Sequence, residues 1–127
     1  MSIWTHVSAT IRIDDLNSIF GNNSTDLSKV FIRDTWEHSN ENGNLPTGSE
    51  GSLDVEFIER PENDGGQYMK TVCIFGDLRD YEDLSPIHSW WLNIKKNLPI
   101  GCDIRQGVLL AECENGKKLI LTDKDMK

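Results

Sequence analysis

The sequence predicts a single α+β domain over residues 1–127, with helices on one face of an antiparallel sheet. Several segments show the alternation of apolar and polar residues that is typical of half-buried strands. One later segment instead has apolar residues at helical spacing. A chain of 127 residues can bury a substantial core, so neither a metal nor a disulfide is needed to hold the domain together.

The first half of the chain is expected to contain two strands and one short helix. Residues 3–13 predict the first strand, because apolar side chains occupy alternate positions. A short, irregular helix should follow, starting at the N-cap candidates Ser24 or Thr25. Residues 38–51 are nearly all turn formers and predict a mobile loop. Residues 52–59 alternate again and predict the second strand.

A third strand and the main helix are expected next. The turn sequence PENDGG at residues 61–66 predicts an antiparallel hairpin between the second strand and a third, residues 67–76. Ser85 is a favourable N-cap for the helix, and Pro86 is favourable at its first position. An apolar stripe then extends along the helix to Leu98.

The C-terminal part predicts a second hairpin. Residues 105–114 and 117–122 alternate as strands. The pair Asn115-Gly116 between them favours a type I′ turn, in which both central residues need positive φ. The polar residues 123–127 are expected to fray.

The order strand, helix, strand, strand, helix, strand, strand predicts a ferredoxin-like split βαβ sheet with an added C-terminal hairpin strand. In that topology the first and third strands are central, and the second lies at an edge. Carboxylates on an edge strand discourage pairing with other chains, which gives Asp54 and Glu56 a structural role.

Charge distribution is the strongest functional signal in the sequence. Residues 34–64 contain nine acids and one base, Arg60, and this excess equals the formal net charge of −8 of the whole chain. A charge confined in this way favours basic partners and repels nucleic acid. The acids are Asp34, Glu37, Glu41, Glu50, Asp54, Glu56, Glu59, Glu62 and Asp64.

The sequence predicts a cytoplasmic protein without a cofactor. The N-terminus lacks the basic and apolar regions of a signal peptide, and no apolar run is long enough to span a bilayer. We therefore expect no membrane partner. Cys73, Cys102 and Cys113 match neither a zinc nor a redox spacing, so reduced thiols are expected.

A non-catalytic binding protein is the first functional hypothesis, because the confined charge is not accompanied by a convincing catalytic set. The acidic edge and the loop would engage a basic protein surface, and exposed tryptophans would serve as anchors. The sequence is also compatible with a homo-oligomer. The candidate partner-binding residues are Glu50, Asp54, Glu56, Glu59, Trp4 and Trp36.

Two other hypotheses stay open. A nucleotide or cyclic nucleotide could bind between subunits, although the glycine-containing segment lacks the Gly-Lys-Ser/Thr ending of a P-loop. Its candidate residues are Gly48, Ser49, Gly51, Ser52 and Arg79. A metal-dependent enzyme would use Asp77, Asp80 and Asp83, although consecutive acids on one loop usually face water.

Three segments resemble small uncharacterised proteins carried by tailed phages and prophages: WTHVSATIRID at 4–14, LPTGSEGSL at 45–53 and IFGDLRDYEDL at 74–84. That family has no assigned activity, so the resemblance implies no catalytic residues. It implies expression in the host cytoplasm. Small accessory phage proteins often bind and block a host protein there, as in anti-defence inhibitors, bind a signalling nucleotide, or assist assembly.

Overall fold

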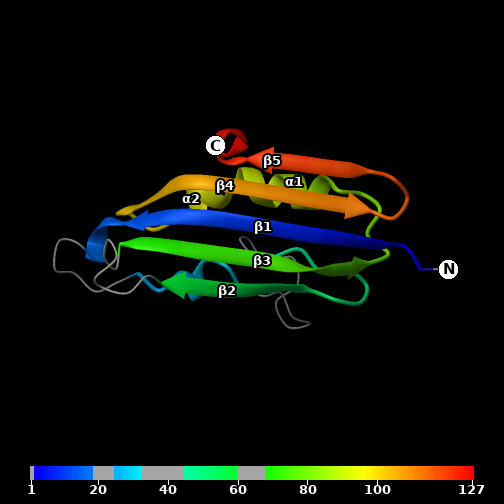
Figure 1. The fold of residues 1–127 in the computed structure, drawn as a ribbon, viewed down its shortest axis with the longest axis horizontal. Coiled ribbons are helices and arrows are strands. Elements are labelled where there is room, and N and C mark those ends of the chain that lie inside the picture. The colour runs from blue at the N-terminus through cyan, green and yellow to red at the C-terminus, as the bar shows by residue number, and fades with distance from the viewer. Residues whose placement is uncertain (1, 19–24, 33–44, 60–67) are drawn as a thin grey trace.

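The computed structural model describes residues 2–18, 25–32, 45–59 and 68–127, and these form a five-stranded antiparallel sheet (Figure 1). The strands are β1 (Trp4–Asp15), β2 (Leu53–Glu59), β3 (Met69–Arg79), β4 (Cys102–Cys113) and β5 (Lys118–Thr122). Their order across the sheet is β2-β3-β1-β4-β5, so β1 is central and β2 and β5 are the two edges.

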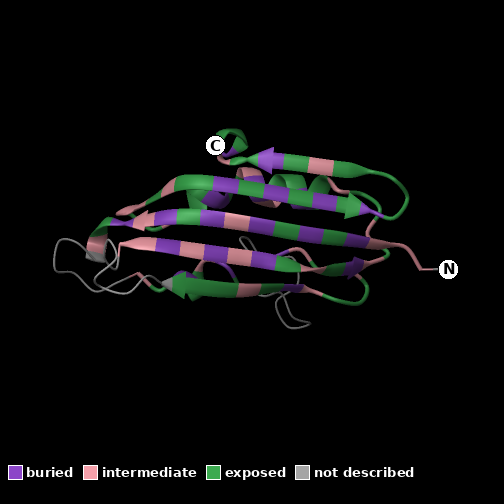
Figure 2. Cartoon of the chain, viewed as in Figure 1, coloured by how far each residue is buried: buried purple, intermediate pink, exposed green. Residues whose placement is uncertain are grey.

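The helices α1 (Ser85–Leu92) and α2 (Ile94–Asn97) lie behind the sheet in Figure 1 and cover one of its faces. The core lies between them and the sheet, and Figure 2 shows the resulting alternation of buried and exposed residues along the strands. Trp91 of α1 is fully buried there, and its Nε1 donates to the carbonyl oxygen of Thr122 at 2.9 Å. The buried strand residues include Val7, Ala9, Ile11, Ile13, Val72, Ile74, Leu78, Leu109 and Ala111.

The predicted ferredoxin-like split βαβ arrangement is wrong. That arrangement needs a helix between its first two strands. In the described part of this connection, the helical residues form only the single 3-10 turns η1 (Leu16–Ser18) and η2 (Leu27–Lys29). Leu27 and Phe31 belong to this irregular segment, and both side chains are buried in the core. Two buried residues four positions apart therefore do not require an α-helix. The central place of the first strand and the edge place of the second are confirmed.

The turn of the C-terminal hairpin also differs from its prediction. Gly116 has a φ of 99°, whereas Asn115 does not have a positive φ. The prediction of a type I′ turn is therefore wrong. The amide of Cys113 donates to the carbonyl oxygen of Lys117 at 2.8 Å, which encloses a three-residue loop with glycine in the left-handed position.

Two segments expected to be loose have defined contacts. The C-terminal residues form the 3-10 turn η4 (Asp123–Asp125), closed by a reciprocal capping box with Thr122. Met126 is buried, and the amide of Lys127 donates to the Leu92 carbonyl oxygen; the fraying of 123–127 stays a prediction. Within the predicted mobile loop 38–51, residues 45–51 form a turn hydrogen-bonded to β3, and 38–44 lie outside the described residues.

Candidate functional site

The face of the sheet opposite α1 and α2, which we call the open face, exposes large apolar side chains from four strands. Strand register places them in neighbouring rows: Ser8 lies opposite Phe75 and Leu110, and Leu110 lies opposite Ile120. Five large apolar residues here are between 36% and 63% exposed: Ile58, Phe75, Val108, Leu110 and Ile120. An exposed apolar patch of this kind on a small protein usually marks an interaction surface.

The acidic edge strand β2 borders this apolar surface. Asp54 lies opposite Phe75, and Glu56 lies opposite Cys73, so both carboxylates belong to the open face. Both residues are exposed. Glu56 forms no ion pair with any other residue in the described ranges. Asp54 and Glu56 therefore place two exposed carboxylates along one border of the open face.

Three further carboxylates of the open face have basic neighbours. Asp77 contacts His6 at 2.6 Å, Glu112 contacts Lys118 at 3.7 Å, and Asp14 contacts Arg105 at 2.8 Å. These exposed pairs contribute little to stability, since water screens them, but the pairs with Lys118 and Arg105 neutralise charge locally. The face therefore carries an acidic border at β2, and part of its other charge is paired.

The structure brings together only some of the predicted partner-binding residues. Glu50 is neutralised by Arg79, whose Nη1 lies 2.7 Å from its carboxylate. Trp4, at the start of β1, is half-buried, and its ring lies 3.5 Å from the point where a Cβ on Gly51 would stand. It therefore packs on the 45–52 turn. Glu59 is the last residue of β2. Trp36 lies outside the described residues, as do Asp34, Glu37, Glu41, Glu62 and Asp64.

The residues of the nucleotide hypothesis do cluster, but their contacts are with one another. The Ser49 amide donates to the Arg79 carbonyl oxygen at 3.1 Å, and the Arg79 amide donates to the Glu50 carbonyl oxygen at 3.0 Å. A Cβ on Gly48 would lie 2.7 Å from the Arg79 backbone, and one on Gly51 would meet the Asp77 carbonyl oxygen. The glycines thus allow the turn to approach β3 closely, while Ser52 forms a bridge to Thr47 across the turn.

The three carboxylates of the metal hypothesis have separate partners. Asp77 contacts His6, Asp80 accepts a hydrogen bond from the Ser49 hydroxyl at 2.9 Å, and Asp83 accepts one from the Ser85 amide at 3.0 Å. Among the described residues, no group of three or more His, Cys, Asp or Glu is arranged to hold a metal ion.

One polar cluster on the open face was not predicted. His6 Nδ1 lies 2.6 Å from Asp77, and its Nε2 lies 3.4 Å from Glu114. The hydrogen bond with Asp77 raises the pKa of His6. Burial opposes this rise, and the contact with Glu114 adds to it. The three residues come from two strands and a turn, so only strand register could have revealed the cluster.

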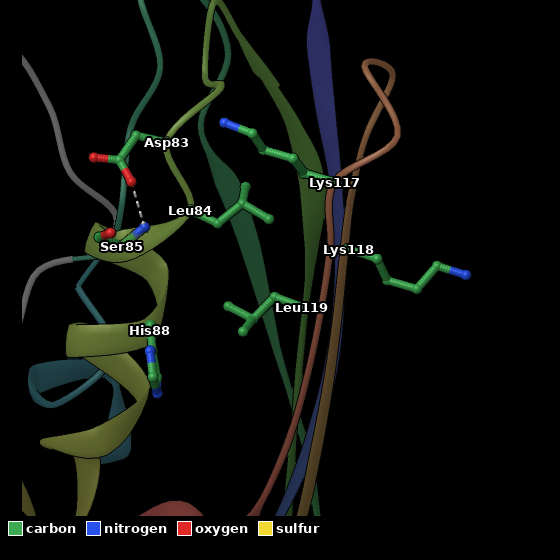
Figure 3. Close-up of a pocket in the computed structure, with 7 residues that line it drawn as sticks. All are labelled: Asp83, Leu84, Ser85, His88, Lys117, Lys118 and Leu119. Carbon is green, nitrogen blue, oxygen red and sulfur yellow. Dashed lines mark hydrogen bonds between the residues drawn. The ribbon is translucent and has the colours of Figure 1, made fainter.

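A cavity of about 410 Å³ lies between the start of α1 and β5 (Figure 3). Two of its polar groups already have hydrogen-bond partners. Asp83 accepts a hydrogen bond from the amide of Ser85, the first residue of α1, and Lys117 Nζ is 3.4 Å from the Glu82 carbonyl oxygen. Lys118 points away from the cavity in Figure 3. The cavity therefore presents no concentrated set of groups toward a ligand.

Comparison with protein-family models, with curated proteins and with solved structures finds no match to the chain. None of the described helices has the length and apolar character needed to cross a membrane.

Proposed function

We propose that this protein is a non-catalytic binding protein whose open face docks a surface of another protein. The gathering of exposed apolar side chains on the face that the helices leave uncovered, next to the acidic strand β2, carries this proposal. Covering those side chains removes apolar surface from water, which is favourable by about 25 cal/mol of free energy for each Å² buried.

The acids of β2 define the kind of partner. Asp54 and Glu56 stand two residues apart on the same face, so two basic side chains that border an apolar patch would complement them. Charge of this kind accelerates encounter and selects among partners more than it adds affinity, and salt weakens it. The resemblance to phage accessory proteins extends the proposal to a host protein, blocked in the host cytoplasm.

The proposal is tested by capture of proteins from host lysate on the immobilised chain at low and high salt. Phe75→Ser removes apolar contact, and the double variant Asp54→Asn/Glu56→Gln removes the acidic border. Ile100→Ser is the matched apolar control, since Ile100 is 98% exposed in the connection between α2 and β4. Glu82→Gln is the control for charge, because Glu82 is exposed outside the sheet.

We expect wild type and both controls to retain the same host protein. Phe75→Ser should no longer capture the host protein. The double variant should capture much less of it, and the amount that it still captures should not depend on salt. Equal capture by all five proteins, or capture that salt does not change, would contradict the proposal.

A further inference from the structure

The second edge of the sheet, β5, has less of the protection found on β2. The β2 sequence LDVEFIE contains three acids, whereas the β5 sequence KLILT contains no acid and no proline. Edge strands normally discourage pairing with other chains by means of charges or proline. The one charge of β5 is Lys118, at its first position.

Hydrogen bonds show which backbone groups of β5 point away from β4. The Cys113 amide donates to the Lys117 carbonyl oxygen, and hydrogen-bonded positions alternate along an antiparallel pair. Lys118, Ile120 and Thr122 therefore direct their N–H and C=O groups outward. Thr122 fits this phase, since its amide donates to Asp125 at 2.8 Å and its carbonyl oxygen accepts from Trp91 at 2.9 Å.

The outward groups of Lys118 and Ile120 have no hydrogen-bond partner within the described residues. Two donors and two acceptors are thus arranged symmetrically about Leu119. We propose that β5 pairs antiparallel with β5 of a second copy of this chain, centred on Leu119. Lys118 of each copy then lies opposite Ile120 of the other, and four hydrogen bonds form.

The capping of Thr122 selects this register. Pairing centred on Ile120 would place Lys118 opposite Thr122, whose outward groups already bind Asp125 and Trp91. Pairing centred on Leu119 leaves those hydrogen bonds intact. It also sets the aliphatic part of Lys118 beside Ile120, which is 63% exposed.

Charge and shape favour a second copy as the occupant. The carboxylates of β2 lie on the opposite edge of the sheet, so two acidic molecules meet at the edges farthest from them. The two Leu119 side chains face each other on the helix side, and the open faces of both copies become continuous. Because the paired segment is short, the dimer should be weak. The dimeric fraction should therefore rise with protein concentration over the range that is measured.

Sedimentation velocity over a range of concentrations tests the pairing. Ile120→Pro removes an outward N–H without breaking the β4–β5 ladder, since proline is tolerated on edge strands. Ile120→Val keeps the N–H and serves as the control. We expect wild type and Ile120→Val to dimerise as concentration rises, and Ile120→Pro to stay monomeric. Monomer at every concentration in the wild type, or an unchanged dimer in Ile120→Pro, would overturn the proposal.

Oxidative cross-linking tests the register in folded protein, with Cys73→Ser as the background. Leu119→Cys places two cysteines at a non-hydrogen-bonded pair about 4.5 Å apart at Cα, within reach of a disulfide. Ile120→Cys places them diagonally, about 7–8 Å apart, beyond that reach. We expect a covalent dimer from Leu119→Cys alone. A dimer from Ile120→Cys alone, or from neither variant, would contradict the register.

Discussion

Replacement of Asp15 by asparagine should cause one of the largest losses of stability in this fold. Asp15 is fully buried at the end of β1. Its carboxylate accepts hydrogen bonds from Lys70 Nζ at 3.1 Å and from the Thr25 amide at 2.7 Å. Burial alone would raise the pKa of Asp15, but the donors on Thr25 and Lys70 outweigh burial and lower the pKa from 3.8 to about 2.

The pKa gives the size of the effect and its dependence on pH. A difference of about 1.8 in pKa between unfolded and folded chains, at about 1.36 kcal/mol for each pKa unit, corresponds to about 2 kcal/mol. Because the folded pKa is the lower one, this contribution is complete above pH 3.8 and is lost as the pH falls toward 2. Asp15→Asn also leaves the Lys70 ammonium, 4% exposed, without its carboxylate, at a cost of about 3–5 kcal/mol.

Urea denaturation of wild type and Asp15→Asn at pH 6 and pH 2 measures this effect. We expect the difference in free energy of unfolding to narrow by about 2 kcal/mol at the lower pH, where Asp15 loses its charge. Asp15→Asn/Lys70→Met should be more stable than Asp15→Asn, since it contains no uncompensated buried charge. A difference that is the same at both pH values would refute the reasoning.

Two further predictions concern the turns and the open face. Gly51→Ala should lower the free energy of unfolding by about 1–3 kcal/mol and Gly116→Ala by about 1 kcal/mol. Both glycines have positive φ, but of the two only Gly51 would place a Cβ against a backbone oxygen, that of Asp77. Equal losses of unfolding free energy for the two variants in urea denaturation would argue against this contact. An NMR titration should give His6 a pKa above 6.5, and Asp77→Asn should lower it; an unchanged value would rule out the pair as the cause. Any stabilisation by the charged pair is present below pH 6.5 and lost as pH rises through the raised pKa.

The strands could be predicted because burial on one face leaves a period of two in the sequence. β1 shows this best, with Val7, Ala9, Ile11 and Ile13 all buried. The main helix could also be predicted in position from Pro86 and the apolar stripe, but the predicted N-cap, Ser85, is wrong: Ser85 is the first helical residue, and Leu84 is the N-cap. The helix divides at Asn93 into α1 and α2. Apolar periodicity does not report such a break, since Trp91 and Ile94 are buried on both sides of it.

The connection after β1 could not be predicted from spacing alone. Leu27 and Phe31 are four residues apart, as in a helix, but they are buried from an irregular segment. The Thr25 amide and hydroxyl bind Asp15, which holds the chain to the end of β1 by side-chain hydrogen bonds. A contact between residues ten apart leaves no periodic signal.

The acidic part of the candidate site could be predicted, but its apolar part could not. Asp54 and Glu56 alternate with apolar residues, so their common face follows from the strand itself. In β4, Val108 and Leu110 lie on one face while Leu109 lies on the other, so both faces have an apolar pattern. Which face is exposed depends on where α1 packs, and that is a property of the tertiary structure.

The central claim, that the open face is the docking surface, is tested most directly by NMR. The isotope-labelled chain is titrated with the host protein recovered by capture, and changes in amide chemical shift are mapped on the sheet. We predict the largest changes at Phe75, Leu110 and Glu56, with little change along α1. Changes that concentrate on α1 or on the 45–52 turn and spare Phe75 and Leu110 would contradict it.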